Sequence, residues 1–163
     1  MTDAPPDSWW WRSEPVVPGP VVVFDMDGVL SDASRRQHLL DQPRRDWDAF
    51  FAASGDDDVI AETARLLEVI DPALPVVLLT ARPLRVRPQT LDWLVRHDLR
   101  WDLLVMRPDD GPVASSDFKR EVVVQLRQDG FDLRLAFEDD RRNVAMFHGE
   151  GVPCVYIHSG YYD

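Results

Sequence analysis

The stretch Pro20-Val21-Val22-Val23-Phe24-Asp25-Met26-Asp27-Gly28 decides the fold of this chain. Its apolar, β-branched first half predicts a strand over about 21–27 that is buried on both faces, and Gly28 permits the sharp turn that follows. Ligands of open α/β sheets collect at the carboxyl ends of strands, so Asp25 and Asp27 are placed for chemistry. Their spacing points both carboxylates to the same side of an extended backbone. One carboxylate can then attack a substrate while its neighbour handles a proton.

The same Asp-x-Asp-Gly sequence is also a common turn, because Asp and Gly favour turns for local reasons. The order of elements along the chain favours the chemical interpretation. Predicted strands alternate with predicted helices, the strands over 21–27, 76–80, 103–106, 133–137 and 154–158 and the helices over about 59–70, 84–97, 117–129 and 141–148. This alternation predicts a Rossmann-like three-layer α/β fold with a five-stranded, mainly parallel sheet.

Two further segments complete the expected organisation. Residues 1–20 are rich in Pro, contain Trp9-Trp10-Trp11 and show no helical or strand period, which predicts a flexible, poorly packed arm. Residues 21–163 form the domain. A small helical insert over about 31–54, with a break near Pro43, follows the first strand, and it is too short to be a large lid domain.

The composition is that of one soluble globular domain. The chain has 163 residues, of which 45% are hydrophobic and 29% are charged. No apolar run reaches membrane-spanning length, and the first twenty residues lack the features of a secretory signal, so we expect a cytoplasmic protein with no membrane contact. The net charge of −11 argues against general affinity for a nucleic-acid backbone.

Polar residues follow the second predicted strand in Thr80-Ala81-Arg82-Pro83. A hydroxyl at a strand end, followed by backbone amides that lead towards a helix, can hold phosphate oxygens. Pro83 suits the start of that helix. An ordinary threonine cap on a turn is the alternative interpretation.

Lys119 is the only lysine among 18 basic residues. A compact ammonium can enter a crowded anionic site that a planar guanidinium cannot, and here the lysine falls in the first turn of a predicted helix capped by Ser116 or Asp117. Positive charge at that position opposes the helix dipole, which suggests an anionic partner such as Asp25. The alternative is a solvated surface lysine.

The fourth predicted strand ends in Glu138-Asp139-Asp140. Adjacent carboxylates repel one another unless a cation offsets them, and carboxylate oxygens are ligands that Mg²⁺ prefers. A solvated acidic loop is the alternative, which the preceding apolar strand disfavours.

Taken in this order, the four segments resemble the haloacid dehalogenase-like phosphohydrolase superfamily over about residues 21–158. The resemblance implies that Asp25 is the nucleophile of an aspartyl-phosphate intermediate and that Asp27 is the acid that protonates the leaving group and then activates water. It implies that Thr80 orients the phosphoryl oxygens and that Lys119 offsets their charge. Mg²⁺ would be held by Asp25, the Asp27 backbone carbonyl and a carboxylate from Asp139 or Asp140.

A narrower resemblance is to the 3′-phosphatase domain of bacteriophage-type polynucleotide kinase/phosphatase. It is carried by several short segments, namely Ser34-Arg35-Arg36, Asp46-Trp47-Asp48-Ala49-Phe50-Phe51, Thr80-Ala81-Arg82-Pro83, Phe118-Lys119-Arg120-Glu121 and Asp139-Asp140-Arg141 with Asn143-Val144. By this resemblance Arg36, Ala81 and Arg82 contact the substrate phosphate. Val29 stands where threonine is commoner.

The expected function is therefore a Mg²⁺-dependent phosphatase acting on 3′-phosphates of nucleic-acid ends or nucleotides. A phosphatase for small metabolites or free nucleotides is the first alternative, and a non-catalytic module that binds a phosphorylated ligand or a partner is the second. The sequence contains no Walker P-loop, and the resemblance leaves open a separate kinase or ligase partner.

Overall fold

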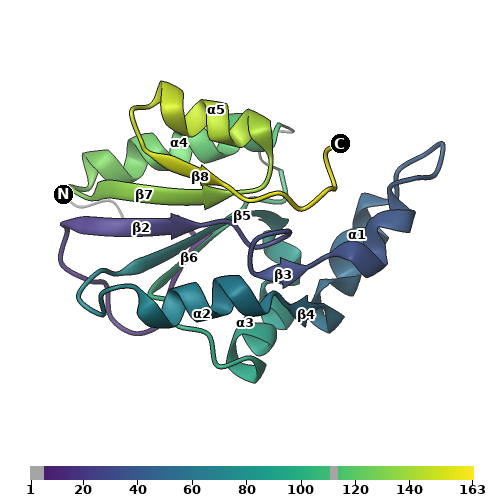
Figure 1. The fold of residues 1–163 in the computed structure, drawn as a ribbon, viewed down its shortest axis with the longest axis horizontal. Coiled ribbons are helices and arrows are strands. Elements are labelled where there is room, and N and C mark those ends of the chain that lie inside the picture. Colours follow the sequence, from purple (N-terminus) through teal and green to yellow (C-terminus); the bar gives the residue numbers. More distant parts are fainter. Residues whose placement is uncertain (1–5, 111–113) are drawn as a thin grey trace.

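A six-stranded sheet forms the centre of the molecule in the computed structural model, which describes residues 6–110 and 114–163. The strand order is β1-β6-β5-β2-β7-β8 (Figure 1). The strands are β1 (Trp9–Trp11), β2 (Pro20–Phe24), β5 (Val76–Pro83), β6 (Leu103–Arg107), β7 (Asp132–Glu138) and β8 (Cys154–Tyr156). The last five are parallel, which confirms the five strands expected from the sequence.

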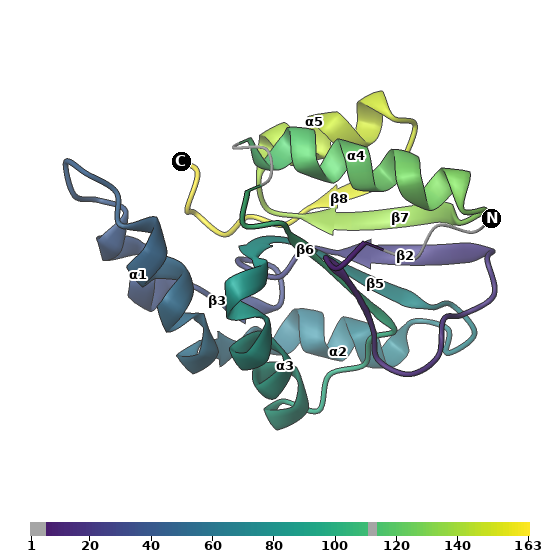
Figure 2. The same ribbon diagram turned by 180° about the vertical axis from the view of Figure 1, so that it is seen from behind.

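Helices cover both faces of this sheet and complete the expected three layers (Figures 1 and 2). One face is covered by α2 (Ala61–Val69) and α3 (Arg87–Arg96), and the other by α4 (Ser115–Gln128) and α5 (Arg141–Gly149). Side chains of β2 alternate between two cores, because successive residues of a strand point to opposite faces. Phe24 packs in the core that contains Trp93 of α3, whereas Val23 packs in the core that contains Phe118 of α4. No helix of the described residues combines the length and the hydrophobicity needed to cross a bilayer.

The insert after β2 stands beyond the carboxyl ends of the strands (Figure 1). Two short antiparallel strands, β3 (Ser31–Asp32) and β4 (Asp58–Val59), close its base. Between them the chain forms three short helices, namely η1 (Ser34–Leu39), α1 (Trp47–Ala52) and η2 (Ala53–Asp56), in agreement with the expected helical insert. The break falls around Pro43, and α1 restarts where the Asp46 side chain accepts a hydrogen bond from the backbone N–H of Ala49.

The prediction of a poorly packed N-terminal arm is wrong at residues 9–11. These tryptophans form β1, which pairs antiparallel with β6, and Trp9 is buried. The pairing gives the edge of β6 hydrogen-bond partners that it would otherwise lack, and it adds the sixth strand. Three consecutive tryptophans carry no alternation of polarity, so the sequence pattern did not indicate a strand. Residues 1–5 of the arm lie outside the described residues.

Two boundaries also differ from expectation. Helix α4 begins at Ser115 after Ala114, so neither Ser116 nor Asp117 caps it, and Lys119 lies in its second turn. Pro83 is the last residue of β5 and does not begin the next helix.

Candidate active site

A buried lysine joins two carboxylates at the carboxyl edge of the sheet. Lys119 Nζ lies 2.9 Å from Asp25 Oδ1 and 2.7 Å from Glu138 Oε2, and all three residues are buried. Asp25 directly follows β2, Glu138 ends the neighbouring strand β7, and Lys119 comes from α4 above them. The structure therefore brings Asp25 and Lys119 together as predicted. It adds Glu138, which the sequence analysis recognised only as part of an acidic cluster.

Negative charge exceeds positive charge in this cluster. Burial and the neighbouring Glu138 raise the pKa of Asp25, and Lys119 only partly opposes them. Burial alone would lower the pKa of Lys119, but Asp25 and Glu138 outweigh it and raise that pKa. Lys119 therefore stays protonated, while burial and Glu138 destabilise the ionised form of the neighbouring Asp25. A bound cation would stabilise that ionised form.

Asp139 supplies the third carboxylate. One oxygen from each of Asp25, Glu138 and Asp139 lies within 4.8 Å of the other two, a spacing that can hold a metal ion. Both oxygens of Asp139 are buried without a hydrogen-bond partner among the described residues. Gly28 makes this approach possible, because a Cβ at that position would overlap the Asp139 carboxylate. An all-carboxylate set with unpartnered oxygens fits Mg²⁺.

Asp140 has a different role from its neighbour. Its Oδ1 accepts a hydrogen bond from the backbone N–H of Arg142 at 2.9 Å, which caps α5, and both of its oxygens accept from the Arg142 side chain. Within the described part of the chain, Asp140 does not belong to the three-carboxylate group. Of the two predicted ligand candidates, the geometry thus favours Asp139.

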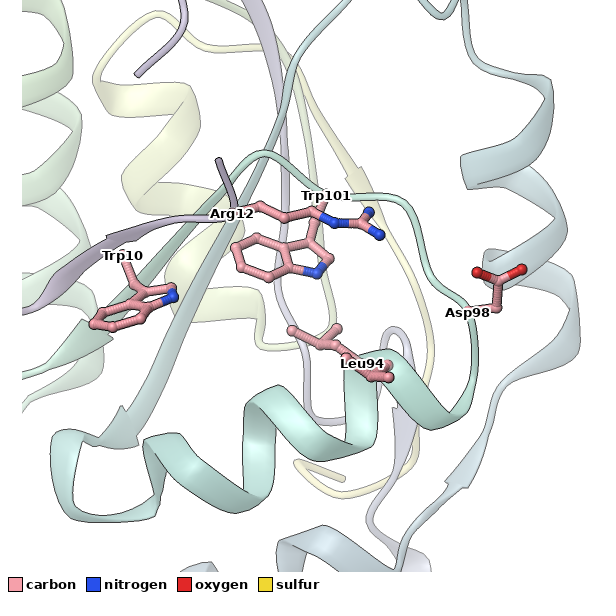
Figure 3. A pocket seen from close by; sticks show the side chains of 6 residues that line it. Trp10, Arg12, Leu94, Asp98 and Trp101 are labelled. Carbon is pink, nitrogen blue, oxygen red and sulfur yellow. The ribbon is translucent and has the colours of Figure 1, made fainter. Parts of the chain in front are cut away.

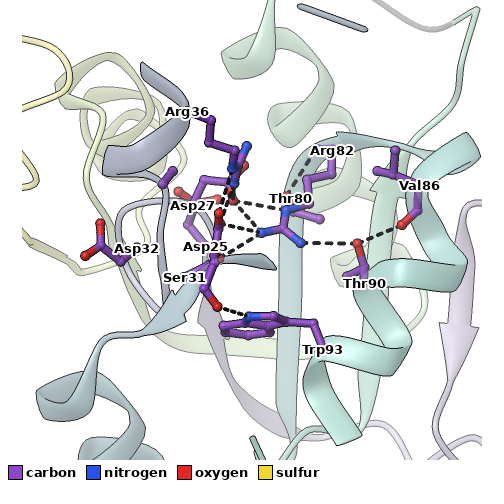
Figure 4. Close-up of polar contacts among 12 residues, drawn as sticks. Asp25, Asp27, Ser31, Asp32, Arg36, Thr80, Arg82, Val86, Thr90 and Trp93 are labelled. Carbon is purple, nitrogen blue, oxygen red and sulfur yellow. Dashed lines mark hydrogen bonds and ion pairs between the residues drawn. The ribbon is translucent and has the colours of Figure 1, made fainter. Parts of the chain in front are cut away.

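Asp27 points away from Lys119 into a pair of buried arginines. Its Oδ1 lies 2.7 Å from Arg36 Nη2 and 2.6 Å from Arg82 Nη2, and Arg82 Nε donates a further bond at 3.0 Å (Figure 4). Burial alone would raise the pKa of Asp27, but Arg82 and Arg36 lower it to about 2. Two buried guanidinium groups that converge on one oxyanion form a suitable site for phosphate.

A second carboxylate, which the sequence analysis missed, holds these arginines. Asp57 accepts from Arg36 Nε at 2.8 Å and from Arg36 Nη2 at 2.6 Å, and its Oδ2 lies 3.5 Å from Arg82 Nη2. Its own backbone carbonyl accepts from the Trp93 indole at 2.8 Å. The sequence analysis did not single out Asp57, because nothing local links it to arginines 21 and 25 residues away along the chain.

Thr80 lies on β5, the strand that pairs with β2, as expected. It is buried at the end region of β5, and its Oγ1 accepts a hydrogen bond from the backbone N–H of Arg82 at 3.1 Å. This bond shapes the segment that contains Ala81 and fixes the start of the Arg82 side chain, which Thr90 anchors further along (Figure 4).

The segment after β8 passes beside the acidic cluster. The N–H of Ile157 donates to the Glu138 carbonyl at 2.8 Å, and Tyr161 Oη donates to Asp32 Oδ1 at 3.1 Å. Tyr162 lies near Arg142, whose guanidinium carbon is 5.7 Å from the centre of its ring. These tyrosines were not among the predicted site residues.

Comparison with known proteins agrees with this geometry. Residues 19–162 match the family described as the polynucleotide kinase PNKP phosphatase domain. The chain belongs to this family. It is therefore a phosphatase domain of the haloacid dehalogenase-like type, which confirms the family and the enzyme class expected from the sequence. No curated protein sequence is significantly similar to it.

Solved structures share the fold of this PNKP-type domain. A chain from the Pnkp1/Rnl/Hen1 complex is 21% identical with a TM-score of 0.73, and the match covers 91% of this chain but only 48% of that one. A class C acid phosphatase from Bacillus anthracis is 14% identical with a TM-score of 0.61, covering 90% and 69%. A haloacid dehalogenase-like hydrolase from Streptococcus pneumoniae is 13% identical with a TM-score of 0.57, covering 86% and 84%. This chain thus spans about half the length of the Pnkp1 complex chain.

The unpartnered Asp139 of this PNKP-type domain gives a stability prediction. Burial, followed by Glu138, raises its pKa from 3.8 to about 7. A carboxyl group whose pKa is raised in the folded state stabilises the fold fully at pH values below its unfolded pKa of 3.8. That contribution is lost as the pH rises through the folded pKa of about 7. In EDTA, Asp139→Asn should therefore raise the free energy of unfolding at pH 8 by on the order of 1 kcal/mol or more. Urea unfolding at pH 5 should show a smaller gain, and a loss of stability at pH 8 would contradict the prediction.

Proposed function

We propose that this domain is a Mg²⁺-dependent phosphomonoesterase that removes 3′-phosphates from nucleic-acid ends through an aspartyl-phosphate intermediate. The observation that carries the proposal is that the two aspartates after β2 have different partners. Asp25 lies with Lys119 and the acidic cluster, while Asp27 lies with Arg36 and Arg82. A nucleophile beside a cation site and an acid beside a phosphate site are the parts that this reaction needs.

In the first step, an Asp25 oxygen attacks phosphorus. The bond from Asp25 to phosphorus forms, and the bond from phosphorus to the 3′ oxygen breaks. Asp27 gives a proton to the departing oxygen, which leaves as a hydroxyl. Lys119, 2.9 Å from Asp25, offsets the negative charge of the adduct.

In the second step, water attacks the phosphorus of the aspartyl-phosphate. Asp27 takes a proton from that water, so inorganic phosphate leaves and Asp25 is restored as a carboxylate. Asp27 must carry a proton in the first step, although its arginine partners hold it ionised in the free domain. We therefore propose that Arg36 and Arg82 turn from Asp27 to the phosphate oxygens when substrate binds.

Mg²⁺ would be held by two of the three clustered carboxylates. Asp25 and Asp139 are the side chains we assign to it, and the unpartnered oxygens of Asp139 are the observation that supports the assignment. The ion would supply charge neutralisation between the nucleophile and the phosphate dianion. The predicted contribution of the Asp27 carbonyl remains part of this proposal.

The preference for a polymer end rests on the insert. Residues between β3 and β4 form only short helices, which leaves no separate lid domain to enclose a small metabolite. The arginines of this region can also attract phosphates. Because a similar chain occurs in the Pnkp1/Rnl/Hen1 RNA repair complex, we propose that a kinase or ligase on another domain or chain acts alongside this one.

The decisive experiment compares three substrates under one set of conditions. We expect a 3′-phosphorylated oligonucleotide to be hydrolysed with higher kcat/KM than its 5′-phosphorylated counterpart or a sugar phosphate. Activity should disappear in EDTA and return with Mg²⁺. The preference should also shrink as salt is added, because phosphate contacts weaken with ionic strength.

The small-metabolite alternative and the metal assignment each have their own signature in that experiment. Equal efficiency on all three substrates, or a salt-independent preference for the sugar phosphate, would support the small-metabolite phosphatase. Full activity in excess EDTA would remove the metal assignment.

A further inference from the structure

We propose that Trp47 is the stacking platform for the base of the nucleotide that carries the 3′-phosphate. The inference rests on the proposed function and names a binding subsite within it. Aromatic side chains bind unstacked bases of either DNA or RNA, since every base has a π face.

Trp47 is held in place yet open to solvent. It is the first residue of α1, and 45% of its surface is exposed. Its ring stacks on Phe51 at 5.8 Å between centroids, with 23° between the planes, and meets Phe50 edge to face at 5.7 Å. Both phenylalanines are buried, so they fix the orientation of the indole that packs on them. The Trp47 side chain therefore loses little conformational freedom when a base lies against it.

The same aromatic cluster leads directly to the phosphate site. The Arg36 guanidinium carbon lies 4.3 Å from the centre of the Phe50 ring, and Arg36 Nη1 donates to the Phe50 carbonyl at 3.1 Å. The Nη2 of Arg36 reaches Asp27 at 2.7 Å. A phosphate on Arg36 and a base on Trp47 would therefore be separated by one intervening aromatic ring, which suits the two ends of a single nucleotide.

Basic side chains near Trp47 can contact a nucleic-acid strand, while the flanking Asp46 caps α1 and Asp48 pairs with Arg85. Arg44 and Arg45 are exposed and precede Trp47 by three and two residues, where they can meet the phosphates of preceding nucleotides. A salt bridge of 2.7 Å from Arg85 to Asp48 ties α1 to the segment that follows Arg82. This exposed ion pair places α1, which carries the proposed base subsite, next to the segment that follows the phosphate-site arginine.

Trp10 provides a matched control. It is exposed to a similar degree, 43%, but the Arg87 guanidinium already lies over its ring at 4.5 Å. It borders a hollow with Arg12, Leu94 and Trp101 that shares no lining residue with the arginine and acidic clusters (Figure 3). Its removal should leave substrate use unchanged.

The test uses two otherwise identical 3′-phosphorylated oligonucleotides, one with a normal terminal nucleotide and one with an abasic terminal sugar. Trp47→Ala should lower kcat/KM for the base-bearing end by a factor of between about 5 and just over 100, the range expected for loss of one base stack. It should change kcat/KM for the abasic end by less than about twofold. Trp47→Phe should recover most of the loss, and Trp10→Ala should behave as wild type on both ends. Deoxyribose and ribose versions of the substrates should respond alike.

The outcomes separate the inference from the proposed function. If Trp47→Ala lowers kcat/KM equally for both ends, Trp47 serves the shape of the insert, and the stacking role is overturned. An unchanged kcat/KM for both ends would overturn the stacking role as well. A wild-type domain that hydrolyses neither 3′-phosphorylated end would overturn the proposed function itself, and the base subsite with it.

Discussion

Replacing Asp25 by Asn is expected to lower phosphate release by at least about 10⁴-fold, because an amide cannot form the acyl-phosphate bond. The fold should survive the change. Burial and Glu138 raise the pKa of Asp25, so a neutral isostere relieves repulsion within the cluster. Steady-state release of phosphate from a 3′-phosphorylated oligonucleotide measures the first effect, and urea unfolding measures the second.

Asp27→Asn is the matched comparison for that experiment. This variant should keep the nucleophile and lose the general acid, which should lower the rate of phosphate release by about 10²- to 10⁴-fold. Acid quenching should then trap protein-bound phosphate in the Asp27→Asn variant and none in the Asp25→Asn variant. Activity of Asp25→Asn within tenfold of wild type would remove Asp25 as the nucleophile, and a loss below tenfold for Asp27→Asn would remove its role as the acid.

Lys119→Met is expected to abolish activity and to lower the free energy of unfolding by about 3–5 kcal/mol, the cost of leaving a buried partner uncompensated. Lys119 is 1% exposed and lies within 3 Å of both Asp25 and Glu138, at 2.9 and 2.7 Å. Removing it leaves two buried carboxylates facing each other. Thermal or urea unfolding in EDTA measures the loss.

A second variant separates stability from catalysis. Lys119→Met combined with Glu138→Gln should regain most of the lost stability, because one of the two charges is gone, while activity stays absent. Lys119→Arg should also fail, since a planar guanidinium does not fit a site this enclosed. Arg120→Met is the control on the same helix, and its exposed ion pairs should contribute no more than about 1 kcal/mol. Wild-type activity of Lys119→Arg would contradict the need for a compact ammonium.

The sequence predicted the parallel sheet because its strands are buried on both faces and appear as short apolar runs between helices. It predicted the meeting of Asp25 with Lys119 because Asp25 follows a buried strand and Lys119 is a lone lysine near the start of a helix, where positive charge needs an anionic partner. The roles of Glu138 and Asp57 could not be predicted in this way. Each depends on which distant cation the folded chain places opposite the carboxylate, and neighbouring acidic residues look alike in sequence.

The N-terminal strand was missed for a different reason. Trp9, Trp10 and Trp11 have no polarity pattern, and their pairing is decided by the open edge of β6 and not by local preference. The break within the insert was visible at Pro43 but its extent was not, because short helices there depend on the packing of Phe50 and Phe51.

The same N-terminal strand has a consequence for how this molecule behaves among its own copies. A β-sheet edge with free N–H and C=O groups is a template for pairing with another chain, and short edge strands limit that hazard. Here β1 covers the five-residue β6, so that both outer edges of the sheet are strands of only three residues. The net charge of −11 adds mutual repulsion between copies. By covering the edge of β6, β1 therefore protects the sheet against edge-to-edge aggregation.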